Sequence, residues 1–286
     1  MENNKIINFH LYRYHLLPID NKNKQLQLFS VEETLTYEQI KQRKNEFFDY
    51  VLKSICNVKE NTHPLKLEHN EETYFIFKIA QKKTRNITKN FQKSSIIDEP
   101  YVYIIINNNS EIQKIAISEN IEAFSNPIVV RNILKKTFNR DLQKYGLNIE
   151  IEQLFDSQEF WNIVEKENQK GITFIDFKYV KPNMANIASS LPDVFRQFSE
   201  NTNSHESQIS IKAAENGILE NIDRNNHNIV GLAEYISKGG GNIRVKAKGI
   251  KKYFNTEEHP VIFEAKEIEI EGAATDIFQF YKTIVK

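Results

Sequence analysis

The chain has 286 residues, of which 40% are hydrophobic, enough for one large domain or two of ordinary size. Its 38 basic and 38 acidic side chains cancel, which excludes a global field that attracts nucleic acid or membranes, so such binding requires local charge segregation. The single cysteine, Cys56, excludes an intramolecular disulfide framework, and we expect a buried structural thiol. No apolar run approaches the roughly 18–20 residues of a membrane span, and no signal peptide is recognised, so we expect a cytoplasmic protein.

The first part of the chain combines several strands with three helices, the last of which is predicted to start at the capping arrangement of Asp156 and Glu159. The strands predicted from period-two alternation are, in chain order, 5–19, 25–29, 74–80, 101–106, 111–118 and 147–154. Thr36 followed by Gln39 predicts a capping box at the start of a helix that runs to about residue 57. Residues 60–72 are expected to form a polar connection. Pro127 predicts the first position of a longer helix, which Gly146 ends.

Two cationic surfaces are predicted in this first part. Residues 78–93 contain six cations and no acid, and we expect a loop that can lie along phosphates. The outer side of the helix that begins at Pro127 carries five cations against one acid. A solvated surface without a ligand is the alternative interpretation of both. The candidate phosphate contacts on these surfaces are Lys82, Lys83, Arg85, Lys135 and Arg140.

The polar stretch 165–171 predicts a domain boundary, which gives an N-terminal domain of residues 1–168 and a C-terminal domain of residues 169–286. In the second domain, strands are predicted at 172–180, 208–213 and 217–222, the last two as a hairpin. A helix is expected after the turn at Pro182, and another over 275–286. The pattern favours an α+β fold of two mixed lobes with mainly antiparallel sheets.

The densest local signal begins with a short helix that stops at Gly239, Gly240 and Gly241, because glycine takes positive φ without a steric cost. From residue 242 the period changes to two, which predicts a strand with an apolar face and a cationic face. No acid lies between Tyr235 and Thr256. The segment therefore favours binding of a polyanion, and a solvated edge strand is the alternative. The candidate contacts are Arg244, Lys246, Lys248 and Lys251.

A second strand is predicted over 261–270, and it contains Glu264 and Lys266. A strand with Glu-x-Lys supplies a metal carboxylate and a lysine in some metal-dependent nucleases, but such sites also need an upstream aspartate that the preceding strand does not offer. The alternative is a charged outer face, formed by Glu264 and Lys266, that pairs across to Lys246 or Lys248. No phosphate loop, dinucleotide fingerprint or metal-ligand spacing of His and Cys is present, so we expect no cofactor and no metal.

The order of elements resembles that of the RexA-like phage-exclusion proteins of bacteria. The likeness lies in the hairpin of 101–118, the helix after it, the strand GITFIDFKYV with its Pro-Asn turn, and the late strand IRVKAKG. The resemblance implies a dimeric protein that binds DNA without sequence preference in an abortive-infection system with a membrane or effector partner. Only Arg244, Lys246 and Lys248 can be carried over as positions of this late strand.

Three hypotheses follow from the sequence. The first, which we favour, is a non-enzymatic antiphage defence protein that binds nucleic acid, DNA above RNA, through local basic surfaces. The second is a metal-dependent nuclease that uses Glu264 and Lys266, and the third is a protein-interaction module that senses a partner. Binding through phosphates alone predicts a steep dependence on salt and no readout of base sequence.

Overall fold

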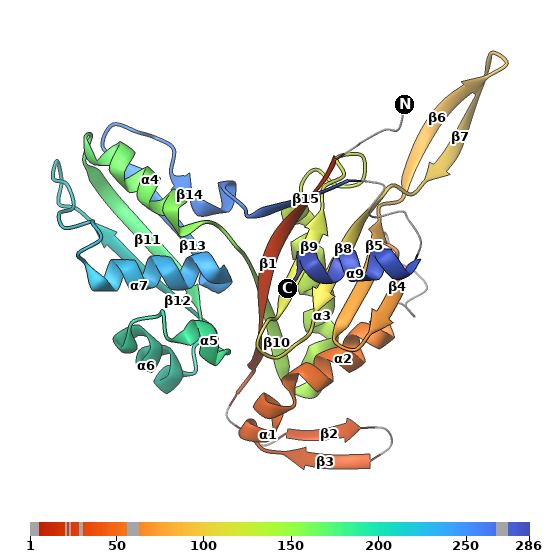
Figure 1. The fold of residues 1–286 in the computed structure, drawn as a ribbon, viewed down its shortest axis with the longest axis horizontal. Helices are drawn as coiled ribbons and strands as arrows, with labels where there is room; N and C mark the ends of the chain where they lie inside the picture. The colour runs from red at the N-terminus through yellow and green to blue at the C-terminus, as the bar shows by residue number, and fades with distance from the viewer. Residues whose placement is uncertain (1–5, 21, 23, 29–30, 56–62, 267–273) are drawn as a thin grey trace. The chain divides into compact units, whose positions relative to one another are not determined.

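The computed structural model describes residues 6–20, 22, 24–28, 31–55, 63–266 and 274–286 (Figure 1). The chain forms two compact units, and each unit is built from separate stretches of sequence. The first unit comprises Met1–His10, Asn45–Leu142 and Ile262–Lys286, and the second comprises Leu11–Lys44 and Gln143–Val261. This division differs from the predicted break after residue 168, because the C-terminal segment belongs to the same unit as the N-terminal one.

The first unit contains a sheet with the strand order β1–β9–β8–β5–β4. Its strands are β1 (Ile6–Pro18, with Ile6–His10 in this unit), β4 (Leu65–Glu71), β5 (Tyr74–Ala80), β8 (Tyr101–Asn107) and β9 (Lys114–Ser118). β15 (Ile262–Lys266) pairs antiparallel with the first residues of β1. The hairpin of β6 (Lys83–Lys89) and β7 (Gln92–Asp98) forms a sheet of its own.

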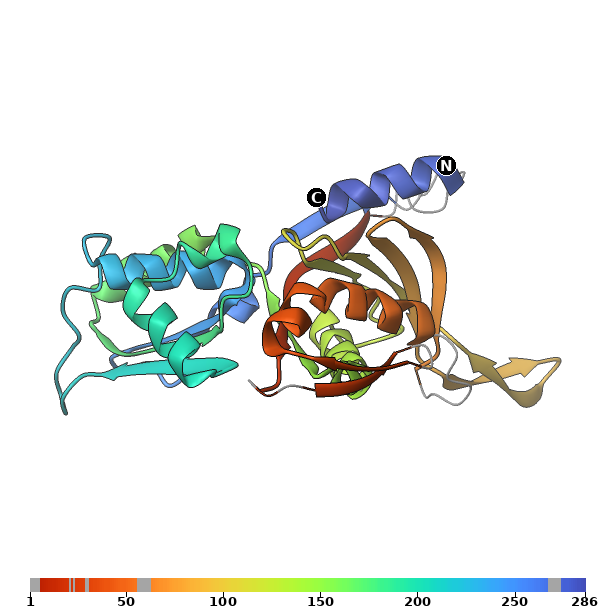
Figure 2. The same ribbon diagram turned by 90° about the horizontal axis from the view of Figure 1, so that it is seen from below.

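Helices cover both faces of this sheet (Figure 2). α2 (Lys44–Ser54) and α3 (Pro127–Leu142) pack together on one face, where the rings of Phe48 and Phe138 meet edge to face at 5.2 Å. α9 (Ala274–Ile284) lies on the other face and places Tyr281 6.2 Å from Tyr103 of β8. Because neither face is open to water, β8 is an almost continuous apolar run and is buried along its length.

The second unit is organised around a four-stranded antiparallel sheet with the order β12–β11–β13–β14. Its strands are β11 (Ile172–Val180), β12 (Glu206–Lys212), β13 (Gly241–Ala247) and β14 (Phe254–Asn255), and its helices are α4 (Ser157–Asn168), α5 (Ala185–Ala188), α6 (Asp193–Thr202) and α7 (His227–Tyr235). Phe177, Ile243 and Val245 of the sheet share one buried core with Phe160 of α4 and Leu232 of α7. The opposite face of the sheet is polar.

The second unit also contains elements outside this four-stranded sheet. The later part of β1, Tyr12–Pro18, pairs antiparallel with β10 (Leu147–Gln153). β2 (Lys24–Leu28) and β3 (Val31–Leu35) form a hairpin that leads into α1 (Tyr37–Gln42). Thr36 caps α1 through the predicted capping box, in which its side chain accepts from the Gln39 backbone. Short 3-10 turns occur at Gln143–Tyr145 and Thr256–Glu258.

The predicted α+β class is confirmed, and so are most of the predicted elements. β1, β5, β8, β10, β11 and β13 occupy the predicted stretches, and α3 begins at Pro127 as expected. Cys56 and residues 267–270 of the predicted late strand lie outside the described residues. Among the helices that the structure describes, none is long and apolar enough to cross a membrane.

Three predictions of local structure are wrong. The expected polar connection of 60–72 contains β4, which is a polar sheet edge and so lacks a strong apolar alternation. The expected cationic loop of 78–93 is largely the hairpin β6–β7. Its strands are exposed on both faces, so they lack the alternation of apolar and polar residues that predicts a strand. Its turn places Asn90 and Phe91 at φ 52° and 61°, as two-residue hairpin turns require. Residues 217–222 form no strand, although the Leu219 amide donates to the Ile172 carbonyl.

Candidate nucleic-acid interface

The three glycines before β13 are explained by close packing of the backbone. α7 continues into a π turn at Ile236–Gly240, where Gly239 has φ 85°. A Cβ on Gly239 would lie 2.4 Å from the Arg13 Cβ, and one on Gly241 would lie 2.0 Å from the Lys178 carbonyl oxygen. All three glycines are buried. The glycines therefore allow the helix to turn tightly into the strand, and they do not form an open cradle for a phosphate.

β13 alternates as the sequence predicts. Ile243, Val245 and Ala247 are buried in the core, and Arg244 and Lys246 emerge on the polar face of the sheet. In the register with β11, Arg244 lies opposite Asp176 and Lys246 lies opposite Phe174. The cationic face of β13 therefore lies beside a carboxylate at one position and an aromatic ring at the next.

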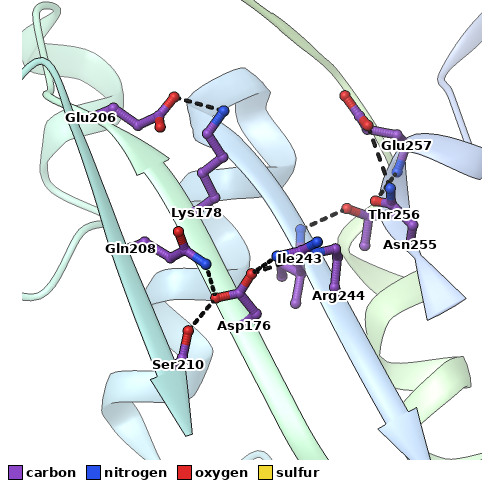
Figure 3. A network of polar contacts seen from close by, with 10 residues as sticks. All are labelled: Asp176, Lys178, Glu206, Gln208, Ser210, Ile243, Arg244, Asn255, Thr256 and Glu257. Carbon is purple, nitrogen blue, oxygen red and sulfur yellow. Dashed lines mark hydrogen bonds and ion pairs between the residues drawn. The ribbon is translucent and has the colours of Figure 1, made fainter. Parts of the chain in front are cut away.

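Asp176 organises the centre of the polar face (Figure 3). Its carboxylate is 1% exposed and accepts from Gln208 Nε2 at 2.7 Å, Ser210 Oγ at 2.6 Å and Arg244 Nε at 3.1 Å and Nη2 at 2.5 Å. Burial alone would raise the pKa of Asp176, but the hydrogen bonds from Ser210, Arg244 and Gln208 outweigh it and lower that pKa. Arg244, a predicted phosphate contact, is therefore committed to a buried carboxylate.

One end of the polar face is acidic. Lys178 Nζ lies 2.6 Å from a carboxylate oxygen of Glu206 (Figure 3), and Glu150, Glu152 and Glu206 place carboxylate oxygens within 4.8 Å of one another. Burial alone would lower the pKa of Lys178, but the hydrogen bond to Glu206 and the charges of the three glutamates raise it. The ammonium of Lys178 thus supplies a positive charge to this cluster.

The other end of the same face is an open, basic groove of about 1000 Å³. We call it the lysine groove and define it by the side chains of Lys212, Lys246, Lys248, Lys251, Phe174 and Tyr253, with Glu215 as the one acidic residue in its lining. β11, β12 and β13 and the loop before β14 contribute these residues. The groove thus collects positive charge that the chain as a whole lacks.

Two aromatic rings lie within the lysine groove. Phe174 and Tyr253 meet edge to face, with ring centroids 5.7 Å apart. Lys246 Nζ lies 5.1 Å from the Tyr253 ring centroid, and the Arg244 guanidinium lies 5.9 Å from it. Tyr253 is 40% exposed, so part of its ring is available to a flat ligand. Lys248 Nζ donates to the Asn216 carbonyl at 3.1 Å, which holds its stem along the rim.

The other predicted phosphate contacts lie in the first unit, and several of them have carboxylate partners. Arg85 on the hairpin pairs with Asp98 and with Glu122 at 2.8 Å. Lys83 Nζ donates to the Glu122 carbonyl at 2.5 Å, and Lys82 lies 3.9 Å from Glu99. On α3, Lys135 is half-buried, and Arg140 pairs with the adjacent Asp141 at 2.9 Å.

Glu264 and Lys266 are placed on β15, where they lie opposite Asn8 and Ile6 of β1. The expected pairing with Lys246 or Lys248 is wrong, because the strand neighbours of β13 are β11 and β14. Among the described residues, the group of acids close enough to share a metal ion is Glu150, Glu152 and Glu206, and it does not include Glu264. Within the part of the chain that the structure describes, the Glu-x-Lys motif thus belongs to no group of three or more metal-ligating side chains.

Sequence reasoning missed Asp176, Phe174, Lys212 and Tyr253. Phe174 lies within one predicted strand, and Lys212 lies near the end of the next. Neither pattern indicated a contact with Lys246. Only the position of Tyr253, directly after Lys251 and Lys252, was a usable signal of an aromatic group beside cations. Neither a scan against protein-family models nor a search of curated proteins finds a match for this chain.

Proposed function

We propose that this protein binds nucleic acid without sequence preference, through the lysine groove of its second unit. The observation that carries the proposal is the meeting of four lysines and two aromatic rings in one open groove. Proteins that bind single strands combine a positive groove for the phosphates with aromatic side chains on which bases stack. Bases are available for stacking only where they are unpaired, so we propose single-stranded DNA as the preferred ligand.

The expected affinity is modest and strongly salt-dependent. Each phosphate neutralised on a single strand contributes about −0.7 to the slope of log affinity against log salt. Three or four lysine contacts in the groove therefore give a slope of roughly −2 to −3. The overall charge of zero adds no long-range attraction, so the groove itself must supply the electrostatic part of binding.

The biological setting that we propose rests on the resemblance to the RexA-like proteins alone. On that ground we propose a role in antiphage defence, a homodimeric state and a membrane or effector partner. The lysine groove adds a physical basis for the nucleic-acid part of that role, because two of its residues, Lys246 and Lys248, belong to the late strand IRVKAKG that carries the resemblance.

The proposal is tested by neutralising the groove. We expect the triple variant Lys246→Gln, Lys248→Gln, Lys251→Gln to bind a fluorescent oligo(dT) on the order of 10²-fold more weakly at low salt. Its salt slope should be shallower by about 2, since three phosphate contacts are lost. The measurement is fluorescence anisotropy across a salt titration, with a duplex of matched length alongside.

The control variant is Lys166→Gln, which removes an exposed lysine on α4 that does not line the groove. It should bind like the unaltered protein. Equal binding by the groove variant and the unaltered protein, with matching melting temperatures, would contradict the proposal. Failure of the unaltered protein to bind either oligonucleotide in dilute buffer would contradict it as well.

A further inference from the structure

The second unit contains another lysine-rich site, and it shares no lining residue with the lysine groove. This site is a cavity of about 520 Å³ between the end of β1, α1, the start of α2 and the segments that follow β11 and α6. Lys41, Lys44 and Lys181 line it, together with one carboxylate, that of Glu200. Three ammonium groups thus face a cavity with a single acidic residue in its lining.

Lys44 is the most deeply placed of the three lysines. The residue is 7% exposed, and its Nζ donates to the Asn183 carbonyl at 2.7 Å. Burial, together with the charge of Lys41, lowers the pKa of Lys44 to about 8. No carboxylate among the described residues forms an ion pair with Lys44. A buried ammonium in this setting is stabilised by any anion that enters the cavity.

Lys181 is also held in place by polar contacts of its ammonium group. Its Nζ donates to Asn203 Oδ1 at 2.8 Å and lies 3.5 Å from the Tyr37 hydroxyl. Burial and the charge of Lys41 lower the pKa of Lys181. Asn203 closes α6 in the left-handed conformation, at φ 49°. The ammonium is therefore held at the cavity by the asparagine that ends α6.

The wall around the lysines is held in place by hydrogen bonds. Asn183 accepts from Lys44 through its carbonyl, while its side-chain nitrogen donates to the Leu16 carbonyl at 3.3 Å. The buried His15 lies 2.9 Å from Asn183 Oδ1 through Nδ1 and 2.7 Å from the Gly239 carbonyl oxygen through Nε2. His205 Nε2 lies 2.8 Å from the Pro18 carbonyl oxygen. The cavity is thus preorganised, which lowers the entropic cost of binding.

We propose that this cavity binds a small organic phosphate, whose negative charge offsets the positive charge of the three lysines. Its volume lies within the range of small-molecule sites, which are about 300–1000 Å³. The phosphate oxygens accept from the N–H groups of Lys44 and Lys181 that do not donate to Asn183 and Asn203, since each ammonium has three donors. Leu16, Leu17 and Pro182 provide an apolar surface for the uncharged part of the ligand. A mononucleotide and a sugar phosphate share this chemistry.

The test uses the full chain and four probes at millimolar concentration: inorganic phosphate, adenosine 5′-monophosphate, glucose 6-phosphate and uncharged adenosine. We expect at least one of the two organic phosphates to raise the melting temperature by several degrees, and by more than inorganic phosphate does, because a ligand that binds only the folded state stabilises it. Adenosine should have no effect. A response to adenosine monophosphate alone assigns a nucleotide, and a response to glucose 6-phosphate alone assigns a sugar phosphate.

The single variants Lys44→Met and Lys181→Met should abolish this shift. Lys44→Met removes a buried charge and keeps most of the side-chain volume, so it should fold, and its own melting temperature verifies this. Lys166→Met and the triple groove variant should both keep the response, which separates this site from nucleic-acid binding. The inference is overturned if neither organic phosphate shifts the melting temperature of the unaltered protein, or if the two cavity variants respond as it does.

Discussion

The hairpin β6–β7 and the strand β13 have similar cationic sequences and different surroundings in the structure. On the hairpin, Arg85 pairs with two carboxylates, and Lys82 and Lys83 lie beside Glu99 and the Glu122 carbonyl. In the lysine groove, no described carboxylate forms an ion pair with Lys246, Lys248 or Lys251, and an aromatic ring lies beside Lys246.

The difference shows that a run of cations without acids along the sequence does not determine the charge of the folded surface. Asp98 reaches the hairpin cations from the paired strand, and Glu122 reaches them from a loop after β9. The partners of β13 bring Phe174, Lys212 and Tyr253 instead. We therefore expect the two surfaces to respond differently to the same removal of charge, and the predictions below test that difference.

The largest effect of a single substitution in the groove is expected for Tyr253→Ala. Stacking of a base on an aromatic side chain contributes about 1–3 kcal/mol, so affinity for oligo(dT) should fall by roughly 10-fold or more. Affinity for a duplex should change little, because paired bases cannot stack on the ring. Anisotropy titrations measure both, and Tyr253→Phe should retain binding because it retains the ring. An equal loss on single strand and duplex would argue against stacking.

A smaller effect on binding is expected for Arg244→Gln, although Arg244 lies on the same strand face as Lys246. Because its guanidinium is committed to Asp176, affinity should fall by less than about threefold. The free energy of unfolding should fall by about 1–2 kcal/mol, since a buried carboxylate loses its cation. We place this figure below that of a fully buried pair because the Arg244 side chain is 44% exposed.

The stability effect of Arg244→Gln should also depend on pH. The folded state lowers the pKa of Asp176, so its contribution is present above the unfolded value of about 3.9 and is lost as the pH falls through the folded value. Urea denaturation should separate the variant from the unaltered protein at pH 7, and the difference should shrink as the pH falls below about 3.9. A difference that grows on acidification would contradict the assignment of the Arg244–Asp176 pair.

Local features of the fold could be predicted from the sequence because local physics determines them. The alternation of β13, the capping box at Thr36 and the start of α3 at Pro127 depend on neighbouring residues alone. The lysine groove depends on contacts between residues far apart in the chain, such as Phe174 with Tyr253. No periodicity within a segment encodes that contact.

The same reason explains the failures around β15 and the cavity. β15 follows β13 in the chain but pairs with β1, so the alternative in which its charged face pairs across to Lys246 or Lys248 is wrong. Lys44 and Lys181 lie in separate predicted elements, and only the fold places both on one cavity. Sequence reasoning found the basic strand, and it could not find the side chains that surround it.

The central claim is that the lysine groove, and not cationic character in general, binds the nucleic acid. The most direct test compares two variants with the same change in net charge: the triple groove variant and the triple variant Lys82→Gln, Lys83→Gln, Arg85→Gln on the hairpin. In salt-titrated anisotropy with oligo(dT), we expect the groove variant to lose on the order of 10²-fold and the hairpin variant less than about threefold. Equal losses, or a larger loss in the hairpin variant, would contradict the claim.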